Sequence, residues 1–144
     1  MHRWRVQDAS TATVFDVLAD ADHYGKWWPQ VRRVQRLSDD VGLVWVRSAL
    51  PITLRLRLTR RVTDPDAGAL AVAIAGDLRG WARWEVRDDP LTPGAVIADY
   101  RQQVAVIAPL LRRAAAYARP VVIANHHWMM RSGERGLRRR LRAP

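Results

Sequence analysis

Six segments between residues 31 and 106 constrain the fold more than any other feature of the sequence. In most of these segments apolar and polar side chains alternate, the two-residue period of a strand with one buried face. Clusters of Pro, Gly and Asp separate the segments every 8 to 12 residues, and connections this short favour antiparallel neighbours. The segments are residues 31–37, 43–49, 52–63, 69–76, 81–87 and 96–106. The sequence therefore predicts an antiparallel sheet.

The C-terminal residues 121–141 change to a helical period. At about 100° per residue, one side of the predicted helix is apolar apart from one imidazole, and the other side is charged. The buried side is predicted to hold Val122, His126, Met129, Met130, Gly133, Leu137 and Leu141. A helix this long needs an apolar surface to lie on, and the sheet supplies it.

Shorter elements flank the six segments. Trp4 and Val6 alternate with polar neighbours as in a strand, and Ser10 stands as the N-cap of a helix over residues 11–19. A short aromatic helix over residues 22–28 follows. Pro109 opens a helix over residues 110–118, and Pro120 is expected to stop or kink it before the terminal helix.

Composition sets the class of protein. The 144 residues suit one domain, no cysteine is present to form a disulfide or a thiolate site, and no cofactor motif occurs. The first residues lack the apolar core of a signal peptide, so we expect a cytoplasmic protein. The positive charge lies mostly in residues 110–144, with 9 basic and 1 acidic side chains against 15 and 13 before them. Arginine in place of lysine suggests a bacterial source with a GC-rich genome.

The order of these elements, with four sequence pieces, resembles the START-like superfamily, and within it the SRPBCC group of polyketide cyclases/dehydrases and lipid-transport proteins. The pieces are residues 14–20, 27–29, 76–80 and 125–137, with the sequences VFDVLAD, WWP, GDLRG and NHHWMMRSGERGL. The resemblance implies an α+β helix-grip fold over the whole chain, a seven-stranded curved antiparallel sheet around the terminal helix. It also implies an apolar cavity between them.

Three functions follow from this interpretation. The first is binding, with possible transport, of a hydrophobic small molecule such as a lipid or polyketide. The second is a cofactor-independent polyketide cyclase, aromatase or dehydratase with His126 as acid/base and Tyr100 or Asn125 polarising a carbonyl. The third is binding of an anionic membrane surface through the helix arginines, against the plainer interpretation of a solvated face. The arginines meant in this third function are Arg131, Arg135, Arg138, Arg139 and Arg142. Nucleic acid is a less favoured partner, and monomer and dimer both stay open.

His126 is the leading site candidate because it lies at the centre of the buried helix face, where it either contacts ligand or is a core histidine with a partner. His127 points about 100° away, so the pair cannot bind one metal ion from one face, and we expect no metal site and a solvent-facing His127. The predicted cavity wall comprises Tyr24, Trp28, Trp84, Val122, Asn125, Met129, Met130 and Gly133. Gly133 serves either close packing or ligand space.

Two strands allow predictions of side-chain direction. On the last strand, the set with Val96, Ala98 and Tyr100 is expected to face inward. The resemblance implies an arginine inside the cavity of aromatase/cyclases, but the alternation turns Arg55 and Arg57 outward. Arg61 lies in the same strand segment as these two arginines. Residues 76–80 are expected to form a hairpin loop between two strands.

Overall fold

The computed structural model describes residues 2–47, 53–107, 113 and 119–142. Seven antiparallel strands form one sheet in the order β1-β7-β6-β5-β4-β3-β2. The strands are β1 (His2–Gln7), β2 (Val31–Arg36), β3 (Val41–Arg47), β4 (Thr53–Asp64), β5 (Ala69–Gly76), β6 (Leu78–Asp88) and β7 (Ala95–Val106). The helices are α1 (Thr11–Ala19), the 3-10 helix η1 (Ala21–Lys26) and α3 (Arg119–Arg142). The α+β helix-grip architecture is the predicted one.

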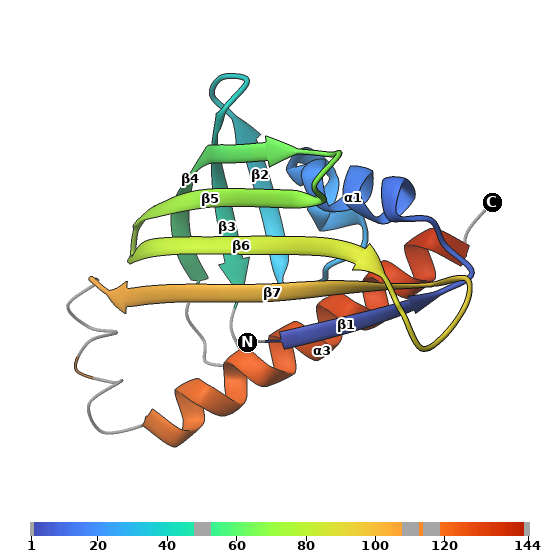
Figure 1. The fold of residues 1–144 in the computed structure, drawn as a ribbon. Helices are drawn as coiled ribbons and strands as arrows, with labels where there is room; N and C mark the ends of the chain where they lie inside the picture. Colours follow the sequence, from blue (N-terminus) through green and yellow to red (C-terminus); the bar gives the residue numbers. More distant parts are fainter. Residues whose placement is uncertain (1, 48–52, 108–112, 114–118, 143–144) are drawn as a thin grey trace.

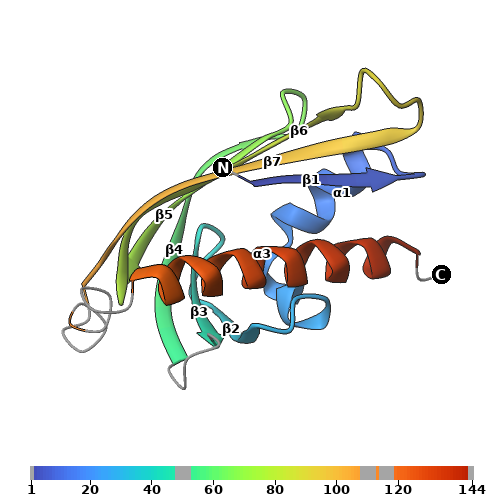
Figure 2. The ribbon, with the colours of Figure 1, turned by 90° about the horizontal axis from the view of Figure 1, so that it is seen from below.

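The sheet curves, and α3 lies across its open side (Figures 1 and 2). Inward and outward residues alternate along β4, where Leu56 is buried while Arg55 and Arg57 are exposed. The outward phase predicted for these two arginines is therefore confirmed. The apolar side chains of alternate positions cover the concave face, which is where the sheet meets α1, η1 and α3.

The helix ends follow local chemistry. The Ser10 side chain accepts a hydrogen bond of 3.1 Å from the Thr13 amide and so caps α1. Helix α3 already includes Arg119, with Pro120 in its first turn, where a missing N–H costs no helical hydrogen bond. The helix predicted over residues 110–118 lies outside the described residues. No described helix combines the length and apolar character needed to span a bilayer.

The buried face of α3 is partly the predicted one. Met130, Gly133 and Leu137 are buried, and so are Ser132 and Gly136, which the helical period had not assigned to this face. The reason is close backbone packing. A Cβ on Gly133 would lie 2.6 Å from Cε2 of Trp28, and one on Gly136 would lie 1.7 Å from the Trp27 carbonyl oxygen. Two glycines thus allow α3 to lie directly on the two tryptophans.

The turn between β5 and β6 is tighter than the expected hairpin loop over residues 76–80. Gly76 still belongs to β5 and Leu78 already belongs to β6, so Asp77 alone connects them. Gly76 has a φ of 103°, a conformation that favours glycine. The Asp77 carboxylate accepts a hydrogen bond of 2.8 Å from the Arg55 amide. This bond links the turn between β5 and β6 to the neighbouring strand β4.

Candidate functional site

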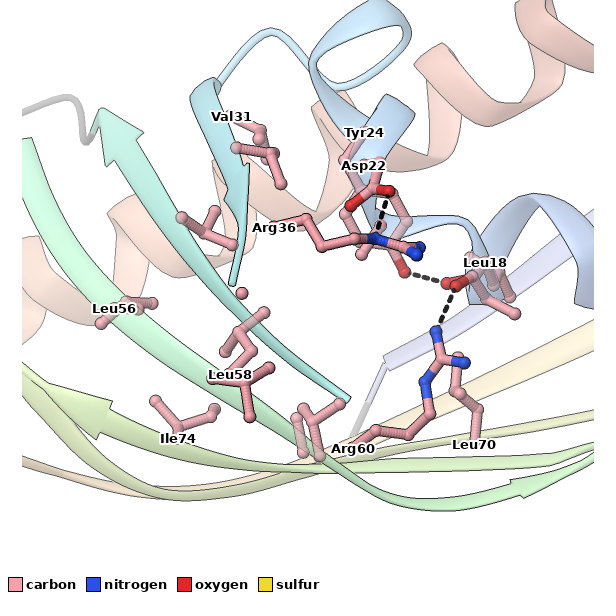
Figure 3. A pocket seen from close by; sticks show the side chains of 18 of the residues that line it. Leu18, Asp22, Tyr24, Val31, Arg36, Leu56, Leu58, Arg60, Leu70 and Ile74 are labelled. Carbon is pink, nitrogen blue, oxygen red and sulfur yellow. Dashed lines mark hydrogen bonds and ion pairs between the residues drawn. The ribbon is translucent and has the colours of Figure 1, made fainter. Parts of the chain in front are cut away.

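A cavity of about 180 Å³ lies between the concave face of the sheet, the end of α1, η1 and one side chain of α3 (Figure 3). Its wall is apolar because it collects the inward-facing positions of successive strands. The aliphatic and aromatic wall from the sheet consists of Val31, Val34, Val44, Val46, Leu56, Leu58, Leu70, Val72, Ile74, Ala82, Trp84 and Tyr100. An apolar cavity is therefore present, but it lies mainly between the sheet, α1 and η1, and the terminal helix that was predicted to form one side contributes only Met129 to the lining.

The rim of the cavity is polar and exposed. Arg36, at the end of β2, forms an ion pair of 2.8 Å with Asp22 of η1 and a longer one of 3.8 Å with Asp39. Ser38 and Asp40 also line this side. The exposed charges identify the open side of the cavity, between η1 and the β2–β3 turn, and the Arg36 pair joins these two segments across it.

Arg60 is the charged residue that sequence reasoning missed. It is half-buried on β4 and lines the cavity, and its Nη2 donates a hydrogen bond of 3.1 Å to the Ala19 carbonyl. The alternation that places Leu54, Leu56 and Leu58 inward continues to Arg60, and that signal was available in the sequence. The strand register then shifts between Arg60 and Val62.

Arg60 and Tyr24 meet at the C-terminal end of α1. The Tyr24 hydroxyl donates to the Leu18 carbonyl, next to the Ala19 carbonyl that Arg60 binds (Figure 3). The last carbonyls of a helix lack helical partners and carry its partial negative charge, so a guanidinium there is favourable. Among the described residues, Ala19 is the only acceptor that the Arg60 guanidinium contacts, so N–H groups remain for a ligand oxygen.

Tyr100 lines the cavity from β7, and beyond it Arg101 and Gln103 are exposed while Gln102 and Val104 are half-buried, so the inward phase predicted for this strand is confirmed. The Tyr100 hydroxyl donates to Oε1 of Gln102 at 2.7 Å, and its ring centroid lies 4.7 Å from that of Trp84. Burial raises the pKa of Tyr100 above its ordinary value. The phenol is therefore protonated near neutral pH and acts as a hydrogen-bond donor.

Trp28 and Met129 close the helix side of the cavity. Nε1 of Trp28 donates to the Met129 carbonyl at 3.1 Å, and both residues line the cavity. Gly133 serves the packing of Trp28 against α3 and is not a lining residue, so close packing is the alternative that holds. Met130 is 2% exposed and belongs to the core around Leu137 without lining the cavity.

His126 is not among the residues that line the cavity. Its ring centroid lies 4.9 Å from that of His2 on β1, and His2 lies 5.0 Å from His127. The prediction that His126 looks into the cavity is corrected, because β1 pairs with β7 at the sheet edge and passes over this part of α3 (Figure 1). Burial, followed by repulsion from His2 and His127, lowers the pKa of His126 to about 4.

The remaining predictions for α3 have different outcomes. His127 is exposed, as predicted. The side chains of Val122 and Asn125 lie outside the described residues, so their predicted contacts stay predictions. Within the part of the chain that the structure describes, no three His, Asp or Glu side chains are arranged to hold a metal ion.

The family follows from a direct match. The model of the family described as polyketide cyclase/dehydrase and lipid transport matches residues 2–142. The chain belongs to this family. Arg60 lines the cavity of this chain, whereas Arg55, Arg57 and Arg61 do not. No protein with a curated description matches the chain.

Solved structures share the fold of this polyketide cyclase/dehydrase family member at low identity. A START superfamily protein from Mycobacterium smegmatis is 15% identical with a TM-score of 0.74, covering 96% of this chain and 93% of that one. A protein from Thermus thermophilus is 14% identical with a TM-score of 0.77, covering 96% of each chain. The Zhui aromatase/cyclase from Streptomyces sp. R1128 is 20% identical with a TM-score of 0.66, covering 99% and 94%. These likenesses concern the fold.

Proposed function

We propose that this protein binds a hydrophobic small molecule in the cavity, with the apolar body of the ligand against the sheet and an oxygen atom near Arg60 or Tyr100. The observation that carries the proposal is the composition of the wall, which inside the polar rim is aliphatic and aromatic except for Arg60 and the hydroxyls of Tyr24 and Tyr100. Binding sites for small molecules combine apolar walls with a few placed polar groups in this way. The family and its structural relatives support the same class of ligand.

The size of the cavity limits the size of the ligand that it can enclose. An apolar cavity of about 150 Å³ accepts benzene, and drug-sized ligands occupy about 300 Å³ or more. At about 180 Å³, the cavity encloses roughly one aromatic ring. A longer lipid or polyketide would extend through the open side, past the Arg36–Asp22 pair.

A series of one-ring ligands tests the proposal by titration calorimetry. Toluene tests the apolar wall, 4-methylphenol adds a hydroxyl, and 4-methylbenzoate adds a carboxylate that Arg60 can pair with. We expect saturable binding of all three, with the carboxylate tightest because a guanidinium forms charge-assisted hydrogen bonds. Absence of saturable binding by any of the three, together with no ligand retained in native mass spectrometry of the purified protein, would reject the proposal.

A cyclase or dehydratase activity is the second candidate, favoured by the Tyr100 phenol in the cavity and by the fold shared with the Zhui aromatase/cyclase. In this function the single O–H of Tyr100 turns from Gln102 to a substrate carbonyl and polarises it, and the acid/base role proposed for His126 passes to another group. The carboxylates that line the cavity, Asp22, Asp39 and Asp40, all lie on the exposed rim. Turnover of a polyketide substrate that falls with Tyr100→Phe and survives His126→Ala would support it.

A further inference from the structure

A second concave site lies on the other side of η1. Asp22 and Tyr24 of η1 line the cavity, whereas Gly25 and Lys26 line a separate notch of about 320 Å³. We call this second site the cationic notch. Its lining residues are Gly25, Lys26, Trp27, Pro29, Gly136, Arg139 and Arg140.

Backbone packing brings three cations to this notch. The Cα of Gly136 lies against the Trp27 carbonyl so closely that a Cβ would be 1.7 Å from the oxygen. Lys26 immediately precedes Trp27, and Arg139 and Arg140 follow Gly136 by about one helical turn. The contact of Trp27, the residue after η1, with Gly136 of α3 therefore fixes the positions from which an ammonium and two guanidinium groups extend.

The described acidic residues near these elements have other partners. Glu134 pairs with Arg138 at 3.7 Å, Asp22 pairs with Arg36, and Asp20 pairs with His23. No residue lining the notch is acidic, and within the described ranges no ion pair involves Lys26, Arg139 or Arg140. Like charges held together repel, and the repulsion grows as the salt concentration falls.

We propose that the cationic notch binds a phosphate group. Guanidinium groups match phosphate oxygens with paired N–H donors, and a lysine ammonium adds a compact charge. The phosphate belongs either to a soluble phosphate compound or to the headgroup of an anionic phospholipid. This site is separate from the cavity, so its function does not depend on the proposed ligand of the cavity.

Amide NMR with inorganic phosphate tests the site. We expect saturable shifts at Gly25, Trp27 and Gly136 that sodium chloride of equal ionic strength does not produce. Lys26→Gln and the double variant Arg139→Gln/Arg140→Gln should weaken the affinity at least about tenfold, the loss of one charge-assisted hydrogen bond. Arg131→Gln and Arg135→Gln, exposed arginines of α3 outside the notch, serve as matched controls and should keep the shifts.

Thermal unfolding gives an independent readout, because Lys26→Gln should raise the unfolding temperature without phosphate and reduce the stabilisation that phosphate gives. At low salt without phosphate, Lys26→Gln should unfold at a higher temperature than the wild type because it relieves repulsion, and phosphate should stabilise the wild type more than the variant. Equal responses of wild type, notch variants and controls to phosphate and chloride would overturn the proposal, since that result is general screening.

Vesicles distinguish the two sources of the phosphate group. Wild type and Lys26→Gln are compared for binding to phosphatidylcholine vesicles with and without phosphatidylglycerol. Binding that requires phosphatidylglycerol and is lost in the variant supports a lipid headgroup. Phosphate binding in solution without vesicle binding supports a soluble phosphate compound.

Discussion

Arg60 on β4 and His126 on α3 are both polar side chains in otherwise apolar stripes, yet they lie in different places. Arg60 lines the cavity and binds the end of α1, whereas His126 lies between β1 and α3 beside His2. The cavity side carries a guanidinium that donates to the last turn of α1. The histidine side carries rings that repel one another when protonated.

The difference has a geometric origin. A two-residue period on a strand assigns each side chain to one of two faces, and the concave face of a curved sheet is one continuous surface. A helical period also identifies a buried face, but the face of α3 contacts β1 in one place and the cavity and tryptophans in another. Burial of a helix residue therefore does not show what it contacts.

Filling the cavity gives the largest expected effect. Ala82 is 6% exposed and lines the cavity, so Ala82→Leu places three additional carbon atoms in the space of the ligand. We expect the affinity for toluene in calorimetry to fall by at least about 30-fold, equivalent to about 2 kcal/mol. Ala75→Leu, on the exposed face of β5, is the control and should bind normally. Equal binding by Ala82→Leu and the wild type would place the ligand elsewhere.

Replacing Arg60 separates its two roles. Arg60→Met should bind 4-methylbenzoate about tenfold more weakly and toluene with unchanged affinity, because only the first ligand has a carboxylate. Loss of the bond to the Ala19 carbonyl should also lower the free energy of unfolding by about 1 kcal/mol in urea denaturation. Arg61→Met, at the exposed neighbour, controls for the loss of charge. An equal loss for both ligands would reduce Arg60 to a structural role.

Tyr100→Phe should have a smaller effect. It removes the hydroxyl that donates to Gln102 and keeps the ring that lies beside Trp84. The affinity for 4-methylphenol should fall about fivefold, equivalent to about 1 kcal/mol, while that for toluene stays constant. A constant affinity for 4-methylphenol would show that its oxygen lies away from Tyr100.

His126→Gln should leave ligand binding unchanged and alter the pH dependence of stability. The pKa of His126 is about 4 in the folded protein against an ordinary 6.5, so between these values the unfolded chain binds a proton that the folded protein does not. The contribution of neutral His126 to the free energy of unfolding is therefore fully present above pH 6.5 and is lost as the pH falls toward 4. Urea denaturation between pH 4 and pH 6.5 gives the slope of the free energy of unfolding against pH. In the variant this slope should be smaller by the amount that corresponds to about one bound proton. An unchanged slope would contradict the burial of His126.

The sequence predicted the sheet, the helix start at Ser10, and the direction of Arg55, Arg57 and Tyr100, because alternation and capping are local. Arg60 was also within reach of alternation. Gly136 and Ser132 were not, since their burial depends on how closely α3 packs on Trp27 and Trp28. The cationic notch depends on the same contact between segments far apart in the chain. The position of His126 depended on β1 reaching the helix from the sheet edge.

The adjacent methionines of α3 give the most direct test of the central claim, that ligand binds in the cavity and not at the histidines. Met129 lines the cavity, whereas Met130 is 2% exposed in the core, and the sequence contains only three methionines. With ¹³C-methyl-methionine and a titration of 4-methylphenol, the Met129 methyl resonance should shift with a saturable ring-current effect. The Met130 methyl and the His126 ring should shift little. A saturable shift at His126 with no shift at Met129 would contradict the claim.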